Sequence, residues 1–163
     1  MKKILFIRHA KSDWSSANLA DIDRPLNKRG KKDAPEMGRR LGERKEKPNC
    51  IFRSPSVRTT QTIDLLSDTA NWKEVEIKEK NWLYMATRRD FLAGIEDLEN
   101  EFDYVCLCAH NPGTTDIVNY LSGENIYNMP TCAIALIEFN TNDWAEVSGG
   151  TGKLLFFDYP KNI

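Results

Sequence analysis

Short apolar runs alternate with stretches of helical spacing along most of the chain. The runs Ile4–Ile7, Cys50–Phe52 and Tyr104–Ala109 are nearly continuous, which is typical of strands buried on both faces of a sheet. Val75–Ile77 alternates with glutamates and predicts a more exposed strand. Between these runs the spacing predicts four helices. One runs from Lys28 to about Lys45 with Asn27 as its N-cap, and the next from Ser56 to Leu66. A third begins at Thr87 and buries Phe91, Ile95 and Leu98, and a fourth contains Ile117, Val118 and Leu121.

The last thirty residues have a different character. Three strand-like runs follow one another there, Ala133–Phe139, Trp144–Val147 and Lys153–Phe157, joined by turn-forming residues at 141–143 and 149–152. The alternation of strands and helices before them predicts an α/β fold with parallel core strands, and the C-terminal strands are then added at an edge or as a hairpin. No repeat, linker or low-complexity tract divides the chain, so we expect a single domain over residues 1–163.

Composition and charge narrow the function classes. With 163 residues, 40% of them hydrophobic, the chain can bury a core without a disulfide or a metal. It has 23 Lys and Arg against 24 Asp and Glu, which leaves no positive field for nucleic acid. No apolar run is long enough for a signal peptide or a membrane span, and we expect a cytoplasmic protein without membrane contact. The four cysteines lie in or beside apolar runs, which favours buried free thiols over a zinc site; they are Cys50, Cys106, Cys108 and Cys132.

Basic side chains follow three of the predicted buried strands. The only two histidines of the chain, His9 and His110, each come at a strand end, and Arg8 precedes the first. Arg58 falls in the first turn of the helix after the second strand, where free backbone N–H groups favour an anion. Taken singly, each group is more typical of a structural histidine or a solvated arginine. Together they lie where ligands bind in such sheets, beyond the carboxyl ends of the strands.

Two guanidinium groups and two imidazoles around one small cavity suit phosphate. Arginine forks match phosphoryl oxygens and need no metal. A neutral histidine can attack phosphorus in line when one ring nitrogen is fixed by a hydrogen bond to a backbone carbonyl. Nearby arginines favour the neutral ring and stabilise the phosphoryl oxygens during transfer. These residue types therefore predict phosphoryl chemistry.

The same residues resemble a known family. Arg8-His9-Ala10-Lys11-Ser12-Asp13-Trp14 is similar to the R-H-G-x-S-x-W signature of the histidine phosphatase superfamily, which contains phosphoglycerate mutases and acid phosphatases. Three further segments, in the same order along the chain, are similar to its small SixA-like branch of phosphohistidine phosphatases: D-R-P-L-N-K-R-G at 23–30, S-P-S-V-R-T-T-Q-T at 54–62 and A-H-N-P-G at 109–113.

The resemblance implies a phosphoglycerate-mutase-like fold, a three-layer sandwich around a mostly parallel sheet with an antiparallel edge. It implies that His9 is the nucleophile that becomes phosphorylated. Arg8, Arg58 and His110 would bind and stabilise the phosphoryl group, with His110 as a charged donor. Ser15 falls where many members have a phosphate-contacting Asn, which makes it a further substrate-binding candidate. No cofactor and no metal are implied.

The chain departs from the family pattern at two positions. Ala10 replaces the usual Gly after the histidine, and we expect an extended rather than a left-handed backbone there. Met85 takes the place where larger members have a carboxylate that acts as proton donor. The remaining candidates for that role, Asp13, Asp21 and Glu79, are each more typical of solvated carboxylates.

The missing acid bears on the substrate. An alkoxide leaving group needs a proton, whereas imidazole can be protonated before it leaves, so the sequence favours a phosphohistidine-bearing protein over a small phosphate ester. The segments after Trp14 and after Leu66 are too short for a large lid, and Trp14 either closes the pocket or packs its loop. Two alternatives stay open: a module that binds phosphorylated ligands with little turnover, and a small-molecule phosphomonoesterase.

Overall fold

The computed structural model describes residues 1–163, and a six-stranded sheet forms its centre in the order β3-β2-β4-β1-β5-β6. The strands are β1 (Lys2–Arg8), β2 (Cys50–Arg53), β3 (Glu76–Glu79), β4 (Tyr104–Ala109), β5 (Ile134–Phe139) and β6 (Gly152–Asp158). The first four are parallel to one another, whereas β5 pairs antiparallel with β1, and β6 pairs antiparallel with β5. The expected mostly parallel sheet with an antiparallel edge is confirmed.

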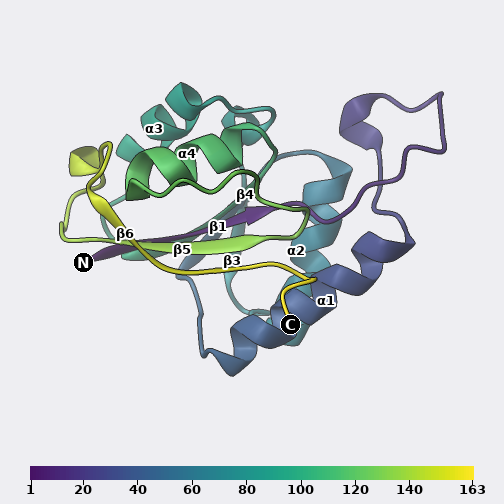
Figure 1. The fold of residues 1–163 in the computed structure, drawn as a ribbon, viewed down its shortest axis with the longest axis horizontal. Coiled ribbons are helices and arrows are strands. Elements are labelled where there is room, and N and C mark those ends of the chain that lie inside the picture. Colours follow the sequence, from purple (N-terminus) through teal and green to yellow (C-terminus); the bar gives the residue numbers. More distant parts are fainter.

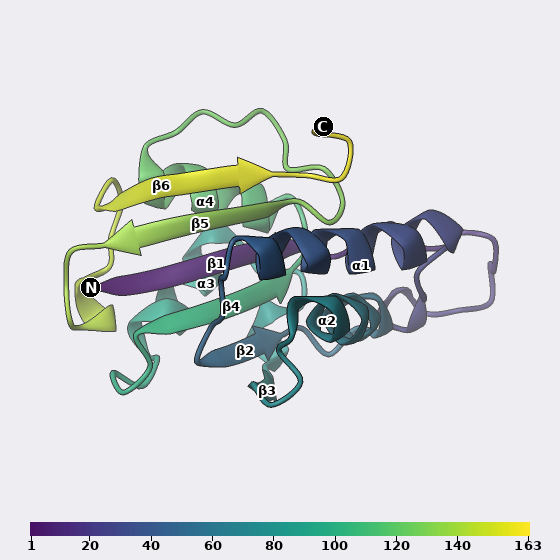
Figure 2. The same cartoon turned by 90° about the horizontal axis from the view of Figure 1, so that it is seen from below.

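Helices cover both faces of this sheet and complete three layers. Helices α1 (Lys28–Glu43) and α2 (Val57–Ala70) lie on one face, and α3 (Arg88–Glu96) and α4 (Gly113–Ser122) lie on the other (Figure 1). Seen from below, α1 and α2 lie side by side across the strands (Figure 2). No helix is both long and apolar enough to cross a membrane.

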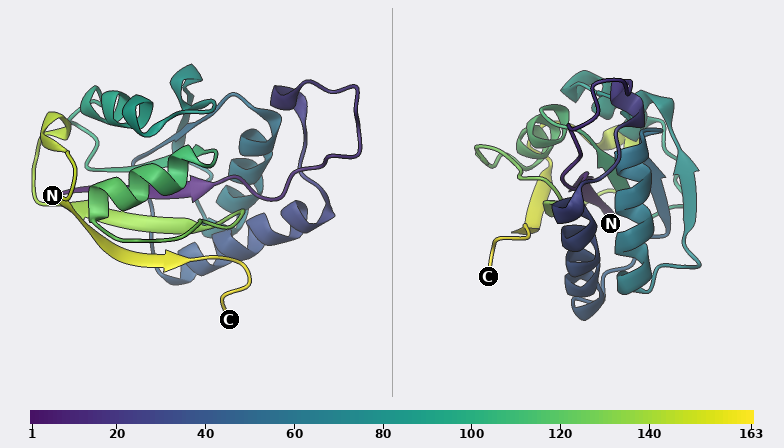
Figure 3. Two further views of the ribbon diagram at one scale, coloured as in Figure 1. Left: turned by 45° about the horizontal axis from the view of Figure 1, so that its top comes forward. Right: turned by 90° about the vertical axis from the view of Figure 1, so that its right-hand side faces the viewer.

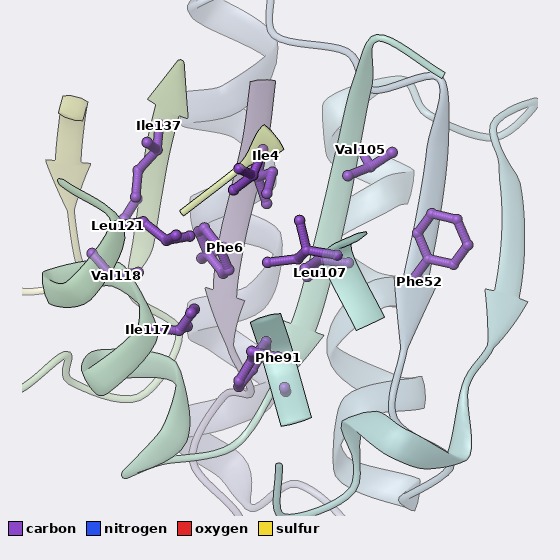
Figure 4. Close-up of a cluster of buried hydrophobic side chains, with 14 of the residues drawn as sticks. Ile4, Phe6, Phe52, Phe91, Val105, Leu107, Ile117, Val118, Leu121 and Ile137 are labelled. Carbon is purple, nitrogen blue, oxygen red and sulfur yellow. The ribbon is translucent and has the colours of Figure 1, made fainter. Parts of the chain in front are cut away.

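Alternate residues of each central strand fill two separate cores. In β1, Ile4 and Phe6 belong to the cluster under α3 and α4, which Figure 4 shows, whereas Leu5 and Ile7 belong to the cluster under α1 and α2. Each such side chain contributes roughly 1.5–3 kcal/mol when it is fully buried. All four cysteines are buried and free, as predicted.

Polar side chains begin the helices at the predicted positions. Asn27 accepts a hydrogen bond from the Gly30 N–H at 2.9 Å, and Thr87 forms a capping box with Asp90. Helix α2 runs to Ala70, four residues beyond the prediction, because its buried side continues through Leu66 and Ala70. It ends at Asn71, which has a left-handed backbone and donates its N–H to the Ser67 carbonyl.

One predicted strand is wrong. Residues 144–146 form a short 3-10 helix, η3 (Trp144–Glu146), rather than a strand over Trp144–Val147. The Asp143 carboxylate accepts a hydrogen bond from the Ala145 N–H and caps the turn. The Trp144 indole donates to the Phe102 carbonyl and its ring is buried, so this segment closes one end of the core instead of extending the sheet. Two further 3-10 turns are η1 (Asp21–Asp23) and η2 (Asn81–Leu83).

The carboxyl ends of β1, β2 and β4 meet at one edge of the sheet, because these strands are parallel neighbours. The segment between β1 and α1, which contains η1, projects past this edge (Figure 3). The strand ends and this segment together form the walls of the site described next.

Candidate active site

A cavity of about 290 Å³ lies at this edge of the sheet. Its lining residues come from the three strand ends, the first loop and two later segments; they are Arg8, His9, Lys11, Ser12, Trp14, Asp21, Arg24, Arg58, Met85, His110, Asn111 and Thr131. Arg8, His9, Arg58 and His110, which lie far apart in the sequence, are therefore brought together as predicted. The cavity is at the small end of the size range of ligand pockets.

His9 lies at the base of the cavity and is only 8% exposed. Its Nδ1 lies 2.7 Å from the Ala10 carbonyl oxygen. Because a carbonyl oxygen only accepts, Nδ1 carries the ring proton and Nε2 keeps its lone pair. Burial, and then the positive charge of Arg58 and Arg8, lowers the pKa of His9 to about 3. His9 is therefore a neutral ring at pH 7 with one nitrogen available for attack.

The backbone that fixes this ring is itself held in place. The N–H of Ala10 donates to Thr62 Oγ1 at 2.9 Å, and the Thr62 hydroxyl donates to the Arg58 carbonyl at 2.7 Å. Thr62 lies one helical turn after Arg58 on α2, so a single side chain connects the nucleophile loop to the arginine helix. The φ of Ala10 is not positive, so the backbone there is not left-handed, as expected.

Arg8 and Arg58 have donors to spare. Arg8 is fixed by one hydrogen bond, from Nη1 to the Met129 carbonyl at 2.8 Å, and burial lowers its pKa. Arg58 is only 2% exposed and is therefore not a solvated arginine. The Nε atoms of both arginines are buried without any hydrogen-bond partner. Because both arginine side chains line the cavity, an anion bound there would lie beside two guanidinium groups.

His110 differs from its predicted charged state. Its Nδ1 lies 3.2 Å from Arg58 Nη2, and its Nε2 lies 2.8 Å from Ser54 Oγ. An arginine only donates, so Nδ1 is the acceptor and Nε2–H donates to Ser54. Burial, followed by the charge of Arg58, lowers the pKa of His110 to about 3. In the free site His110 is therefore neutral rather than the charged donor expected from the sequence.

Asp21 enters the site from η1 and is the one carboxylate among the lining residues. Its Oδ2 accepts hydrogen bonds from the Tyr84 hydroxyl at 2.5 Å and from Arg58 Nη2 at 3.0 Å, and its Oδ1 accepts from Arg24 Nε and Nη2. The Asp21 main-chain carbonyl also accepts from Arg58 Nη1 at 2.6 Å. These donors, that of Tyr84 foremost, hold the pKa of Asp21 well below its usual range.

The hydrogen-bond network of Asp21 includes neither Ser15 nor Glu79. Ser15 is exposed and does not line the cavity; its N–H donates to the Asp13 carboxylate, which turns the chain away from the strand ends. Glu79 accepts from Arg53 at the end of β2. Trp14 lines the cavity mouth, 71% exposed, and stacks on the Arg24 guanidinium at 3.5 Å.

Comparison with known proteins agrees with the sequence motifs. The family model of the histidine phosphatase superfamily (branch 1) matches residues 4–82, which include Arg8, His9 and Arg58. Over these residues, slightly less than half of the chain, the sequence matches the histidine phosphatase superfamily. The chain is 27% identical over 160 residues to an uncharacterised chloroplastic protein of Arabidopsis thaliana, which covers 93% of the chain and 72% of that protein. It spans 30–38% of the length of the phosphoglycerate mutases that it matches.

Solved structures share the fold over nearly the whole chain. The putative phosphohistidine phosphatase SixA from Agrobacterium tumefaciens superposes with a TM-score of 0.83 at 23% identity. The protein histidine phosphatase SixA complexed with tungstate superposes with a TM-score of 0.82 at 24% identity. Each comparison covers 98% of both chains. The predicted fold class is confirmed, and the family model agrees with the predicted phosphatase superfamily over residues 4–82.

Proposed function

We propose that this protein is a histidine phosphatase that works without a metal, taking a phosphoryl group from phosphohistidine onto His9 and passing it to water. One observation carries the proposal: a neutral His9 lies in a cavity that is also lined by Arg8 and Arg58, and the buried Nε–H groups of these two arginines have no partner. The nucleophile and the donors for the transferred group therefore come together in one place. The positive charge that a phosphoryl group needs is supplied by guanidinium groups.

In the first step, the lone pair of His9 Nε2 attacks phosphorus and the bond from phosphorus to the substrate breaks. The His9 ring becomes cationic, because both of its nitrogens are then substituted. Its Nδ1–H keeps donating to the Ala10 carbonyl, which stabilises that charge. Arg8 and Arg58 face the phosphoryl oxygens, where fixed donors stabilise the charge that develops during transfer.

In the second step, water attacks the phosphoryl group on His9. The bond from phosphorus to Nε2 breaks, its electron pair returns to the ring, and both protons of the water stay on the phosphate, which leaves as dihydrogen phosphate. His9 is then neutral again, which agrees with its lowered pKa. Neither step needs a metal-bound nucleophile.

A protein-borne phosphohistidine is the proposed substrate, and two features support it. Met85 stands beside the cavity where a proton-donating carboxylate would be needed for an alkoxide, and it is 52% exposed. The pocket is small and Trp14 at its mouth is 71% exposed, so a substrate ring on the surface of another protein can reach it. The two SixA structures, named for phosphohistidine and protein histidine phosphatases, point the same way.

The test measures phosphate release from a histidine-phosphorylated peptide in the presence of a chelator. Wild type is expected to release phosphate and to form an acid-labile phosphoenzyme, and His9→Ala is expected to lose both, with a fall in rate of at least about 10³-fold. The matched control is His110→Ala, the only other histidine, which is expected to keep the label on His9. Release by His9→Ala at the wild-type rate contradicts the covalent step, and no release from any substrate favours a binding module.

A further inference from the structure

Asp21 is the only anion in a cationic cavity. The lining contains four basic side chains, Arg8, Lys11, Arg24 and Arg58, against this single carboxylate. The Asp21 side chain is 46% exposed, whereas His9 is 8% exposed. The nucleophile thus lies at the base of the cavity and the carboxylate lies at its mouth.

The contacts of Asp21 keep it ionised. Arg24 and Arg58 donate to its carboxylate, and Tyr84 donates through its hydroxyl. With a pKa held well below its usual range, Asp21 has no proton to give to a leaving group at pH 7. It therefore cannot replace the missing general acid, and its charge must act in another way.

The direction of attack decides what Asp21 faces. In an in-line displacement the leaving group departs on the side of phosphorus opposite the nucleophile. Because His9 lies at the base, the leaving group departs through the mouth, where Asp21 lies. If Asp21 were absent, a leaving ring that carries positive charge would meet guanidinium and ammonium groups and no negative charge among the lining residues.

We propose that Asp21 is a specificity-determining residue, which favours a substrate whose ring is a cationic imidazolium until the bond to phosphorus breaks over a substrate with an oxygen leaving group; this inference rests on the proposed function. A phosphohistidine ring protonated on its second nitrogen is positively charged. An opposite charge within about 4–6 Å stabilises that form, by a factor of ten for each pKa unit. An alkoxide or phenoxide gains nothing from a carboxylate, and its dianionic phosphate is repelled.

The reaction balances without a proton from the enzyme. His9 Nε2 bonds to phosphorus, the bond from phosphorus to the substrate nitrogen breaks, and its electron pair stays on that nitrogen. The proton on the second ring nitrogen remains where it was, so the substrate cation leaves as neutral imidazole. The positive charge has then moved to the His9 ring, and hydrolysis returns that ring to the neutral state while dihydrogen phosphate departs.

A second role for Asp21 makes a different prediction. Its side chain and main-chain carbonyl both hold the Arg58 guanidinium, and in Asp21→Asn the same carbonyl and the new amide oxygen can still accept from Arg58. Loss of the orientation of Arg58 would weaken every phosphorylated substrate and phosphate itself. Loss of a counter-charge for the leaving group would weaken phosphohistidine alone.

The experiment compares Asp21→Asn with wild type on three probes at pH 7.5. These are a histidine-phosphorylated peptide, p-nitrophenyl phosphate, and inorganic phosphate as a competitive inhibitor. We expect kcat/KM for the peptide to fall at least about tenfold. We expect kcat/KM for p-nitrophenyl phosphate and the affinity for inorganic phosphate to stay level or rise, because the cavity becomes more positive.

Two variants serve as controls. Asp21→Glu keeps the charge and is expected to retain most of the peptide selectivity. Asp13→Asn removes a carboxylate of the same loop that does not line the cavity, and is expected to change none of the three readouts. A parallel loss on all three probes, or no change in the ratio of peptide to nitrophenyl ester, overturns the inference. If wild type releases no phosphate from the peptide, the proposed function fails first and the inference fails with it.

Discussion

At the scale of single residues, the chemistry depends on which ring nitrogen each hydrogen bond occupies. The Ala10 carbonyl holds the proton of His9 on Nδ1, which leaves Nε2 as the attacking atom. In His110 both nitrogens are occupied, one by Arg58 and the other by Ser54. The centroids of the two rings lie 5.2 Å apart. The rings are not equivalent, because only His9 has a nitrogen free to attack.

Thr62 is expected to act through the position of His9. In Thr62→Val the buried N–H of Ala10 loses its acceptor, which costs about 1–3 kcal/mol, and the Ala10 peptide is free to rotate. We expect the rate of His9 phosphorylation to fall at least about tenfold, with little change in KM. Thr62→Ser keeps the hydroxyl and is expected to restore the rate. Rapid-quench measurement of the phosphoenzyme gives the rate of His9 phosphorylation in each variant. Equal rates in Thr62→Val and Thr62→Ser would contradict this role.

The sequence predicts some site residues better than others for a physical reason. Arg8, His9 and His110 directly follow buried strands, and the carboxyl ends of parallel neighbours must meet at one edge. Asp21 and Tyr84 lie on 3-10 turns and loops, whose meeting depends on the path of the chain through space. The spacing of Asp21 to Arg24, three residues apart, is the one local signal from which their ion pair could have been predicted.

At the scale of elements, close packing of α1 on α2 sets the position of the arginine helix. A side chain at Gly38 would place its Cβ 2.1 Å from Thr69 Oγ1 and 2.2 Å from the Leu66 carbonyl oxygen. The glycine thus allows the two helices to approach. Because Arg58 and Thr62 are both carried by α2, this packing also bears on the site.

Gly38→Ala and Gly42→Ala form a matched pair on α1. Gly38→Ala forces the two helix backbones apart, and we expect a loss of at least about 1–3 kcal/mol in the free energy of unfolding. At Gly42 the nearest atom would lie 3.4 Å from the new Cβ, and the gain in helix propensity is up to about 1 kcal/mol, so a neutral or stabilising effect is expected. Denaturant unfolding of both variants checks the pair. Equal losses would show that the approach at Gly38 is not the cause.

Helices were predictable wherever an N-cap residue and a stripe of buried side chains coincide. Asn27 begins α1 and Thr87 begins α3 as their side-chain chemistry indicates. The segment after Asp143 was not predictable as a turn, since Trp144 and Val147 are buried and β-favouring. There the tertiary hydrogen bond of Trp144 outweighs the local preference for a strand.

At the scale of the whole molecule, the folded site keeps two histidines neutral at acidic pH values at which the unfolded chain would protonate them. The pKa values of His9 and His110 are lowered to about 3, compared with about 6.5 in an unfolded chain. Below pH 6.5 the unfolded state therefore binds more protons than the folded state. The stability present at higher pH is progressively lost as the pH falls toward 3.

This linkage predicts a pH-dependent stability in a defined window. Between pH 7.5 and 5.5 carboxylates hardly titrate, so the two histidines dominate, and each approaches a loss of about 1.4 kcal/mol per pH unit at the acidic end. The double variant His9→Gln/His110→Gln removes both groups and is expected to flatten the dependence, even if lost hydrogen bonds lower stability at every pH. Urea unfolding at both pH values measures the slope, which separates the two effects. A slope equal to that of wild type would mean that the histidines titrate in the folded cavity as they do in the unfolded chain, and the lowered pKa of the nucleophile would then be wrong.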